Sequence, residues 1–220
     1  MNILDKFLVL LALAILSPLF CVVCALLKFT GEGKVFYLQK RLGKNRKTFF
    51  LYKFATMLEN SPNMATGTVT VKDDPRVLPV GRFLRRTKIN ELPQIINVLR
   101  GDMNIIGPRP LTDETFGYYT KAAGNAILSV APGLSGVGSI IFCDEESLLQ
   151  GSNASSEFYK NKIAPYKEEL EIWYVKNRNF FVNIVLITFT LLILIFPLRA
   201  AIFKIFPTLP QLPDFFKIHG

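Results

Sequence analysis

An uncharged apolar stretch near the N-terminus strongly constrains what this chain can fold into. Residues 7–27 read FLVLLALAILSPLFCVVCALL and contain no charged side chain. A helix of about 20 apolar residues is long enough to cross the hydrocarbon core of a bilayer. A cleaved signal peptide fits poorly, because Asp5 precedes the apolar run, the run is too long and no A-x-A site follows it. The sequence therefore predicts a membrane anchor in residues 1–28.

The anchor contains a Ser17-Pro18 pair at its middle. Proline removes a backbone hydrogen bond and kinks a helix, and a neighbouring serine can help to satisfy the freed carbonyls. Two topologies follow: a kinked helix that spans the bilayer, which is the commoner arrangement, or a broken helix that dips in and returns. Lysine and arginine are dense between residues 28 and 47, so the positive-inside rule places the chain after the anchor in the cytoplasm.

The chain is basic, with a formal net charge of +9 at pH 7 and a pI near 9.5. This charge predicts an anionic partner, which could be nucleic acid, acidic lipid or a phosphorylated substrate. We expect no nucleic-acid partner, because the basic residues crowd beside the anchor, where acidic lipid explains them. Cys21 and Cys24 have CxxC spacing, but no second pair accompanies them, so a zinc or redox site is disfavoured.

Residues 85–110, RRTKINELPQIINVLRGDMNIIGPRP, contain a short predicted helix. Asn90 is placed as an N-cap, Glu91 stands in the first turn and Gly101 is placed to end the helix. We therefore predict a helix over residues 91–100. Its apolar side chains recur at helical spacing, at Leu92, Ile95, Ile96 and Leu99.

Basic residues surround this predicted helix. Arg85 precedes it, and Arg109 follows it in a loop stiffened by two prolines. Lys53 lies in an earlier aromatic segment and is a third candidate for binding phosphate. Guanidinium groups bind phosphate oxygens bidentately, and a helix N-terminus favours anions, so the cluster suits a diphosphate. The alternative is a surface helix with solvated arginines.

The remaining segments are predicted from pattern alone. Residues 131–138 are rich in glycine and could cradle a phosphate or simply turn the chain. Asp144, Glu145 and Glu146 are either a cation-binding or acid/base cluster or the solvated start of a helix. The other expected segments are a basic loop from residue 28, a strand or interfacial segment at 48–57, an exposed loop at 59–79, helices at 112–128 and 156–178, and a membrane-associated helix at 180–196.

Several of these segments together resemble one family. They are Ser17-Pro18 in the apolar anchor, QKRLG at 39–43, YKFATM at 52–57, ELPQIINVLRGDMNIIGPRP at 91–110, PGLSG at 132–136 and WYVKN at 173–177. In this order they are similar to the bacterial sugar transferases known as monotopic phosphoglycosyl transferases. The resemblance extends from the anchor to about residue 190.

The resemblance implies an α/β fold, a mostly helical small cytoplasmic catalytic domain on an N-terminal re-entrant membrane helix with interfacial helices. It therefore favours re-entry of the anchor, residues 1–28, over spanning. Residues 29–179 would form the catalytic domain, and residues 180–220 an apolar membrane-associated C-terminal segment. The implied location is the bacterial inner (cytoplasmic) membrane, with the catalytic domain on its cytoplasmic face.

The resemblance also implies a reaction. A phospho-sugar would pass from a UDP-sugar to undecaprenyl phosphate, releasing UMP with the help of Mg²⁺, in glycoconjugate synthesis. In this family an Asp-Glu pair starts the helix, where the aspartate attacks the diphosphate and the glutamate holds Mg²⁺. Glu91 matches the metal-binding glutamate, and membrane lipids are further expected partners. The oligomeric state is left open, with a homodimer as one option.

Asn90 departs from the family pattern, because it stands where the nucleophilic aspartate is expected. A carboxamide is a very poor nucleophile, yet it caps a helix about as well as a carboxylate does. Three explanations follow: another nucleophile or direct attack by the acceptor, a substrate-trapping replacement, or an impaired member that binds nucleotide sugar or polyprenyl phosphate. The sequence after PGLSG also departs from the commoner pattern, and Asp144 or Glu145 is a candidate to compensate.

Overall fold

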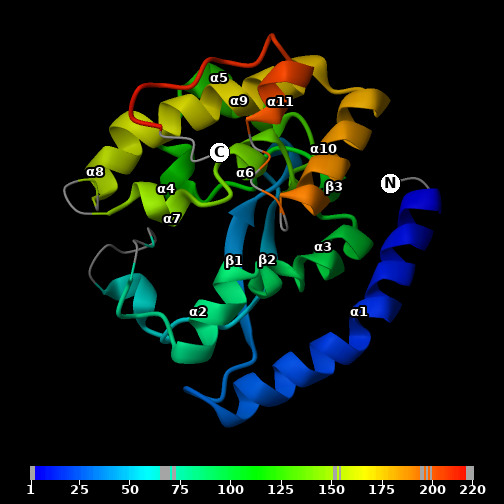
Figure 1. Cartoon of the computed structure of the whole chain (residues 1–220), viewed down its shortest axis with the longest axis vertical. Coiled ribbons are helices and arrows are strands. Elements are labelled where there is room, and N and C mark those ends of the chain that lie inside the picture. The colour runs from blue at the N-terminus through cyan, green and yellow to red at the C-terminus, as the bar shows by residue number, and fades with distance from the viewer. Residues whose placement is uncertain are drawn as a thin grey trace.

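The computed structural model describes residues 3–64, 70, 73–150, 153, 155–193, 196, 198 and 200–216, and confirms a mixed, mostly helical fold (Figure 1). Its strands form two separate pairs, β1 with β2 and β3 with β4. The elements are α1 (Ile3–Phe29), β1 (Phe36–Leu42), η1 (Lys44–Arg46), β2 (Thr48–Phe54), η2 (Ser61–Asn63), α2 (Pro79–Arg86), η3 (Ile89–Glu91), α3 (Gln94–Arg100), β3 (Asn104–Ile106), α4 (Asp113–Phe116), α5 (Lys121–Leu128), β4 (Gly133–Ser135), α6 (Val137–Ile141), α7 (Glu145–Leu148), α8 (Ser156–Phe158), η5 (Tyr159–Ile163), α9 (Ala164–Asn177), α10 (Phe180–Leu192) and α11 (Ala201–Ile205).

The N-terminal helix α1 is continuous through Pro18 and changes direction along its length (Figure 1). An unbroken helix would use the carbonyl of Ala14 to accept from the N–H of residue 18, which proline lacks. Ser17 Oγ donates to that carbonyl at 2.7 Å, as the sequence suggested. Within the described residues, Val9–Phe29 is the helix long and apolar enough to cross a membrane, judged by length and composition.

One side of α1 packs against the rest of the chain at both of its ends. Val9 joins a cluster with Leu51 of β2 and Val98 of α3. Val23 and Leu27 join a second cluster that includes Phe54 of β2 and Leu84 of α2. The opposite side of the helix is apolar and exposed, with Leu10, Leu11, Ile15, Val22 and Leu26. Both halves of the helix therefore lie along the same folded unit.

The hairpin of β1 and β2 is antiparallel and pairs Phe36 with Phe54 and Leu42 with Thr48. Of the two alternatives predicted for residues 48–57, the structure shows a strand, β2, over Thr48–Phe54. The basic loop expected from residue 28 is wrong at Phe36–Leu42, which form β1. Most side chains of β1 are exposed, so its sequence FYLQKRL gives no alternation of apolar and polar residues. The buried amide of Asn97 on α3 accepts from Tyr52 N at 3.0 Å and donates to Phe50 O at 2.8 Å. These bonds tie α3 to the hairpin beside Lys53.

The short strands β3 and β4 run parallel and pair Asn104 with Gly133 and Ile106 with Ser135. This pairing sets the GPRP loop beside the PGLSG loop. A Cβ on Gly133 would lie 2.0 Å from the backbone nitrogen of Gly107, so only glycine permits this approach. The glycine-rich loop thus serves backbone packing in the described structure.

The prediction of a helix over residues 91–100 was wrong at its start. Residues Ile89–Glu91 form the 3₁₀ turn η3, and α3 begins only at Gln94. Pro93 has no N–H to close an α-turn, and its neighbours close shorter turns instead, Leu92 N to Ile89 O at 3.1 Å and Ile96 N to Pro93 O at 3.0 Å. Asn90 therefore lies inside a 3₁₀ turn and caps no helix. The C-terminal end is confirmed, with Gly101 at φ 81°.

Two other predicted helices differ in detail. The helix expected over residues 112–128 is divided into α4 and α5, with α4 capped by Thr112 and α5 by Thr120. The helix expected over 156–178 is confirmed as α8 and α9, joined by a π turn, and Pro165 occupies the first turn of α9. The exposed loop expected over 59–79 contains a buried Arg76, which donates to the carbonyls of Ser61 and Met64 at 2.8 and 2.9 Å.

The largest core gathers α6, α9, α10 and the chain after residue 200. Val182, Leu186 and Phe189 on one side of α10 are buried in it, whereas Phe180 and Leu191 on the other side are exposed. The predicted apolar helix at 180–196 is therefore confirmed as a helix to Leu192, and residues 194 and 195 lie outside the described residues. Its association with a membrane stays a prediction.

Candidate functional site

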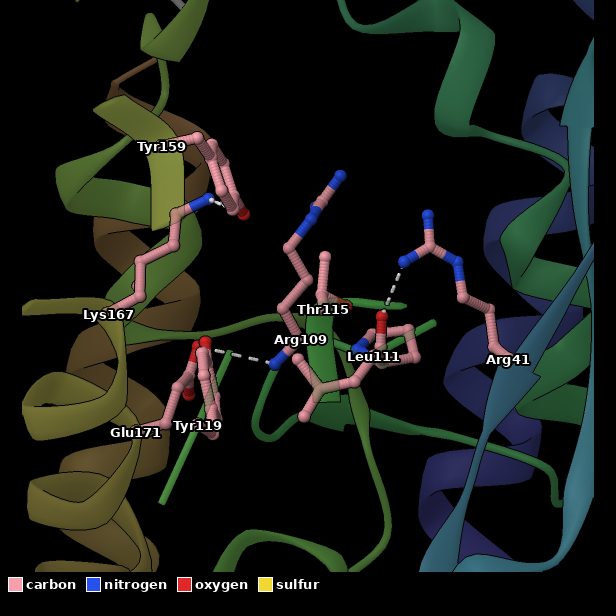
Figure 2. A pocket seen from close by; sticks show the side chains of 10 residues that line it. Arg41, Arg109, Leu111, Thr115, Tyr119, Tyr159, Lys167 and Glu171 are labelled. Atoms are coloured by element: carbon pink, nitrogen blue, oxygen red, sulfur yellow. Dashed lines mark hydrogen bonds between the residues drawn. The ribbon is translucent and has the colours of Figure 1, made fainter. Parts of the chain in front are cut away.

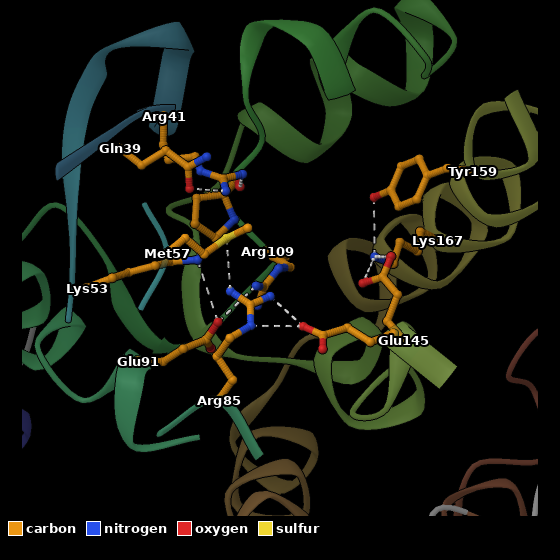
Figure 3. Close-up of polar contacts among 12 residues, drawn as sticks. Gln39, Arg41, Lys53, Met57, Arg85, Glu91, Arg109, Glu145, Tyr159 and Lys167 are labelled. Carbon is orange, nitrogen blue, oxygen red and sulfur yellow. Dashed lines mark hydrogen bonds and ion pairs between the residues drawn. The ribbon is translucent and has the colours of Figure 1, made fainter. Parts of the chain in front are cut away.

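The carboxylate of Glu91 lies at the centre of a partly buried ionic cluster (Figure 3). Its Oε1 is 3.1 Å from Nη2 of Arg109 and 3.7 Å from Nζ of Lys53. Lys53 comes from β2, Glu91 from η3 and Arg109 from the GPRP loop, so three distant segments meet here. The structure thus brings together three of the residues predicted from the sequence.

Burial and charge act against each other in this cluster. Burial raises the pKa of Glu91, but Arg109 and Lys53 together bring it well below its usual range. In return, Glu91 raises the pKa of Arg109 above the already high value of a guanidinium. Burial, with smaller contributions from Arg109 and Arg41, lowers the pKa of Lys53 to about 7 against the opposing effect of Glu91. An anion bound among these cations would favour the charged form of Lys53.

Arg85 reaches the cluster from the end of α2 and forms an ion pair with Glu146 of α7. Its Nε is 3.1 Å from Oε1 of Glu146, and its Nη2 contacts the same oxygen. The remaining nitrogen, Nη1, lies 3.7 Å from the thioether sulfur of Met57. Because a thioether is a weak acceptor, Nη1 retains most of its capacity to bind an anion.

A second acid of α7 faces the cluster from the other side. Both oxygens of Glu145 accept from Lys167 Nζ at 2.7 Å, and the same amine is 3.3 Å from the hydroxyl of Tyr159. The sequence identified Asp144, Glu145 and Glu146 as a candidate cluster, and two of the three lie in the site. Lys167 and Tyr159 were missed, because nothing in the charged segment predicted as a helix over residues 156–178 distinguishes either residue from its neighbours.

A small cavity of about 40 Å³ adjoins Arg109 (Figure 2). Its walls include Arg41, Tyr119, Lys167 and Glu171. Such a volume holds only a few water molecules. Arg41 donates to the carbonyl of Pro110 at 2.9 Å and so holds the GPRP loop against β1. Burial and the nearby Arg109 lower the pKa of Arg41 to about 10.

Glu171 connects three segments beneath this cavity. Its Oε1 accepts from the backbone N–H of Arg109 at 3.3 Å. A Cβ on Gly138 would lie 2.4 Å from the same oxygen, so the glycine at the start of α6 leaves space for the carboxylate. Burial raises the pKa of Glu171 to about 7, although Arg109 and Lys167 oppose it. Glu171 shares one face of α9 with Lys167, Leu170 and Tyr174. This helical spacing is the sequence pattern that could have revealed its burial.

Asn90 lies in the same 3₁₀ turn as Glu91 and is 7% exposed. Its Oδ1 is buried and accepts no hydrogen bond from any described residue. An amide is uncharged at every accessible pH and is not a useful nucleophile. Ser17 and Pro18 lie apart from this site, in the middle of α1.

The described residues hold no group of three or more acidic, histidine or cysteine side chains placed to bind a metal. Glu91 is a single carboxylate among cations, and both of its ion pairs use Oε1. Mg²⁺ usually binds one or two protein carboxylates together with substrate phosphates and water. The donor set is therefore compatible with a Mg²⁺ ion that arrives with a diphosphate, since neither ion pair of Glu91 uses its Oε2.

The chain is similar to a family of known proteins. The model of the family described as bacterial sugar transferase matches residues 1–197. The chain is 34% identical over 197 residues to the exopolysaccharide production protein ExoY of Sinorhizobium fredii (strain NBRC 101917 / NGR234), covering 83% of this chain and 80% of that protein. It is 44% identical over 110 residues to a putative undecaprenyl-phosphate N-acetylgalactosaminyl 1-phosphate transferase of Bacillus subtilis (strain 168), covering 50% and 60%. It is 37% identical over 134 residues to the UDP-glucose:undecaprenyl-phosphate glucose-1-phosphate transferase of Xanthomonas campestris pv. campestris, covering 60% and 28%.

Proposed function

Because the chain belongs to the bacterial sugar transferase family, we propose that it transfers a sugar phosphate from a UDP-sugar to undecaprenyl phosphate and releases UMP. The product would enter the synthesis of a bacterial glycan, such as an exopolysaccharide. The names of the relatives support the acceptor, and two of them differ in the sugar they name. The observation that carries the proposal is the Glu91 carboxylate held by Arg109 and Lys53 beside Arg85.

The cations of this cluster would bind the diphosphate of the donor. Arg109 is oriented by Glu91, and Nη1 of Arg85 contacts the thioether of Met57, a weak acceptor. In phosphoryl transfer the protein contributes mainly positioning and neutralisation of charge, which arginine and lysine supply. Glu91 would also hold Mg²⁺, which neutralises charge on the phosphates when it is bound.

We further propose that α1 enters the membrane from the cytoplasmic face and returns to it. The packing of Val9 and Leu27 supports re-entry, because both ends of the helix contact the same folded unit. A straight spanning helix would carry Val9 away from that unit by about 27 Å over 18 residues. The bond from Ser17 to Ala14 supports a stable bend at Pro18. This topology would place the phosphate of a polyprenyl acceptor near the ionic cluster.

A second candidate function rests on Asn90. An impaired member of the family would bind a UDP-sugar or undecaprenyl phosphate without turnover, because an amide stands at the nucleophile's position. The ionic cluster would be retained in such a protein for binding alone. Turnover is therefore the property that separates the two functions.

The test is release of UMP from a panel of UDP-sugars with undecaprenyl phosphate and Mg²⁺, comparing the chain with Asn90→Asp. We expect release by the unaltered chain. If the unaltered chain releases no UMP but Asn90→Asp does, the site is intact apart from residue 90, and the result supports the impaired function. Silence of both, with UDP-sugar still bound, would favour a binding protein.

A further inference from the structure

The proposed function requires a group that attacks the donor's phosphorus, and residue 90 cannot supply it. The attacking group must be a nucleophile that reaches the cations binding the diphosphate. Besides Asn90, the sequence departs from the family pattern in the segment after PGLSG. In the structure the departing stretch, residues 142–146, leads into α7, whose acids pair with Arg85 and Lys167. Residue 90 and the start of α7 therefore both border the same ionic cluster.

Among the described residues, most carboxylates near the site are committed to other contacts. Glu91 is held by two cations on one oxygen and is the proposed magnesium ligand. Both oxygens of Glu145 are bonded to Lys167. Glu171 is 3% exposed and orients the backbone of Arg109. Asp144 is exposed, and no ion pair joins it to a cation of the described cluster.

Glu146 differs from all of these. Its side chain is 44% exposed, and its ion pair is with a single guanidinium, that of Arg85, through Oε1. A substrate can therefore reach the carboxylate of Glu146 from solvent. Nε and Nη2 of Arg85 hold the carboxylate, while the contact of Nη1 with a described residue is with the sulfur of Met57. One guanidinium can therefore hold Glu146 and a phosphate oxygen at once, side by side.

From this geometry we propose that Glu146 is the nucleophile that replaces the missing aspartate, an inference that rests on the proposed function. A carboxylate oxygen of Glu146 forms a bond to the sugar-bearing phosphorus of the UDP-sugar. The bond from that phosphorus to the bridging oxygen breaks, and UMP leaves with the electron pair. The product is an acyl phosphate of Glu146 that carries the sugar.

The second step restores the enzyme. A phosphate oxygen of undecaprenyl phosphate attacks the same phosphorus, and the bond to Glu146 breaks to regenerate its carboxylate. The sugar then lies on a new diphosphate linked to the lipid, so atoms and charges balance without an oxidant or reductant. Arg85 acts in both steps by holding the carboxylate beside the phosphate.

The experiment traps the first step. The full chain in detergent is mixed with Mg²⁺ and either UDP-glucose or UDP-N-acetylgalactosamine, without acceptor, and its peptides are mapped by mass spectrometry. We expect a stoichiometric burst of UMP and a sugar phosphate on Glu146. Glu146→Gln should remove both and lower turnover with acceptor by about 1,000-fold or more. Glu59→Gln is the matched control, because Glu59 is a 67% exposed surface acid paired with Lys34, and it should retain the adduct.

Other outcomes overturn the inference in distinct ways. An adduct on another residue, or UMP release only when acceptor is present, would reject Glu146 and leave the proposed function standing. A Glu146→Gln chain that binds UDP-sugar more tightly and keeps its burst would mean that Glu146 merely occupies the phosphate's place. Absence of UMP release with both sugars and acceptor, while UDP still binds, would reject the proposed transfer together with the nucleophile.

Discussion

The carboxylate of Glu171 accepts a hydrogen bond from the backbone N–H of Arg109 at 3.3 Å. Helix α9 is thereby tied to the GPRP loop that presents the guanidinium of Arg109 to Glu91. The Glu171 side chain is buried, and its Oε2 accepts no hydrogen bond from any residue the structure describes. A carboxylate in this setting favours its protonated form.

Stability should therefore depend on the protonation of Glu171. Burial raises its pKa from 4.5 to about 7, so between these values the folded chain holds a proton that the unfolded chain has lost. The contribution of Glu171 to the free energy of unfolding should be most favourable below pH 4.5. It should fall as the pH rises to about 7 and stay lower above that pH, by roughly 3 kcal/mol at most. Thermal unfolding from pH 4.5 to 7.5 should show a shallower decline for Glu171→Gln. Glu169→Gln, an exposed acid on the same helix, should keep the original decline, and equal slopes in all three chains would contradict the prediction.

Removal of the Arg109 side chain should weaken binding of the donor. Arg109→Ala removes a partly buried cation that contacts Glu91 and, in the proposed function, the diphosphate. Charge-assisted hydrogen bonds contribute about 1.5–3 kcal/mol, so we expect the dissociation constant for UDP-sugar to rise about 10- to 100-fold. Calorimetric titration would measure it. Arg100→Ala is the control, because Arg100 is a largely exposed cation at the end of α3. Equal effects of both substitutions would indicate that only net charge matters.

Replacement of Glu91 should act through the metal. Glu91→Gln keeps the shape of the side chain and removes its charge, so Mg²⁺ should no longer strengthen the binding of UDP-sugar. Binding in EDTA should change less, because Arg85 and Lys53 remain. The measurement is a titration of UDP-sugar with and without Mg²⁺ in both chains. An unchanged effect of Mg²⁺ in the variant would remove Glu91 as the ligand.

The sequence predicted the site better than the framework that holds it. Lys53, Glu91 and Arg109 could be found from residue type and the resemblance, and the structure places them in contact. Glu171 was missed, because a charged residue on a helix rich in charge is normally solvated; the one signal for its burial is that it shares a helix face with Leu170 and Tyr174. The role of Asn97 was hidden for a similar reason, since its partners are backbone atoms of a distant strand.

The starts of helices were also poorly predicted. Asn90 suited an N-cap by residue type, but the missing N–H of Pro93 shortened the turns around it and moved the start of α3 to Gln94. Most side chains of the strand β1 are exposed, so its sequence lacks the alternation of apolar and polar residues that would predict a strand. By contrast, the pairing of Ser17 with Pro18 was readable, because its effect on the helix is entirely local.

Residues 200–216 lie beyond the family match and should contribute to stability. Phe216 packs on Phe142 and Tyr166, with ring centroids 5.1 and 6.3 Å apart, and Trp173 donates to Thr208 at 3.0 Å. Phe216→Ala should destabilise the fold by about 3–5 kcal/mol, as for other buried aromatics. Phe180→Ala is the control, because Phe180 is 81% exposed. A similar melting temperature for Phe216→Ala and the unaltered chain would show that the segment does not support the core.

The proposed re-entry of α1 depends on Pro18. Pro18→Leu restores an N–H that can bond to the carbonyl of Ala14, so the bend should be lost and a straight apolar helix should span the bilayer. The N-terminus should then become accessible to a membrane-impermeant label from the outer side, whereas in the unaltered chain it should be protected. Ser17→Ala is an informative companion, because it removes the bond to Ala14 but keeps the proline, and it should leave the N-terminus on its original side. If labelling is the same for Pro18→Leu and the unaltered chain, Pro18 does not determine the topology; if both are labelled from outside, α1 spans the membrane.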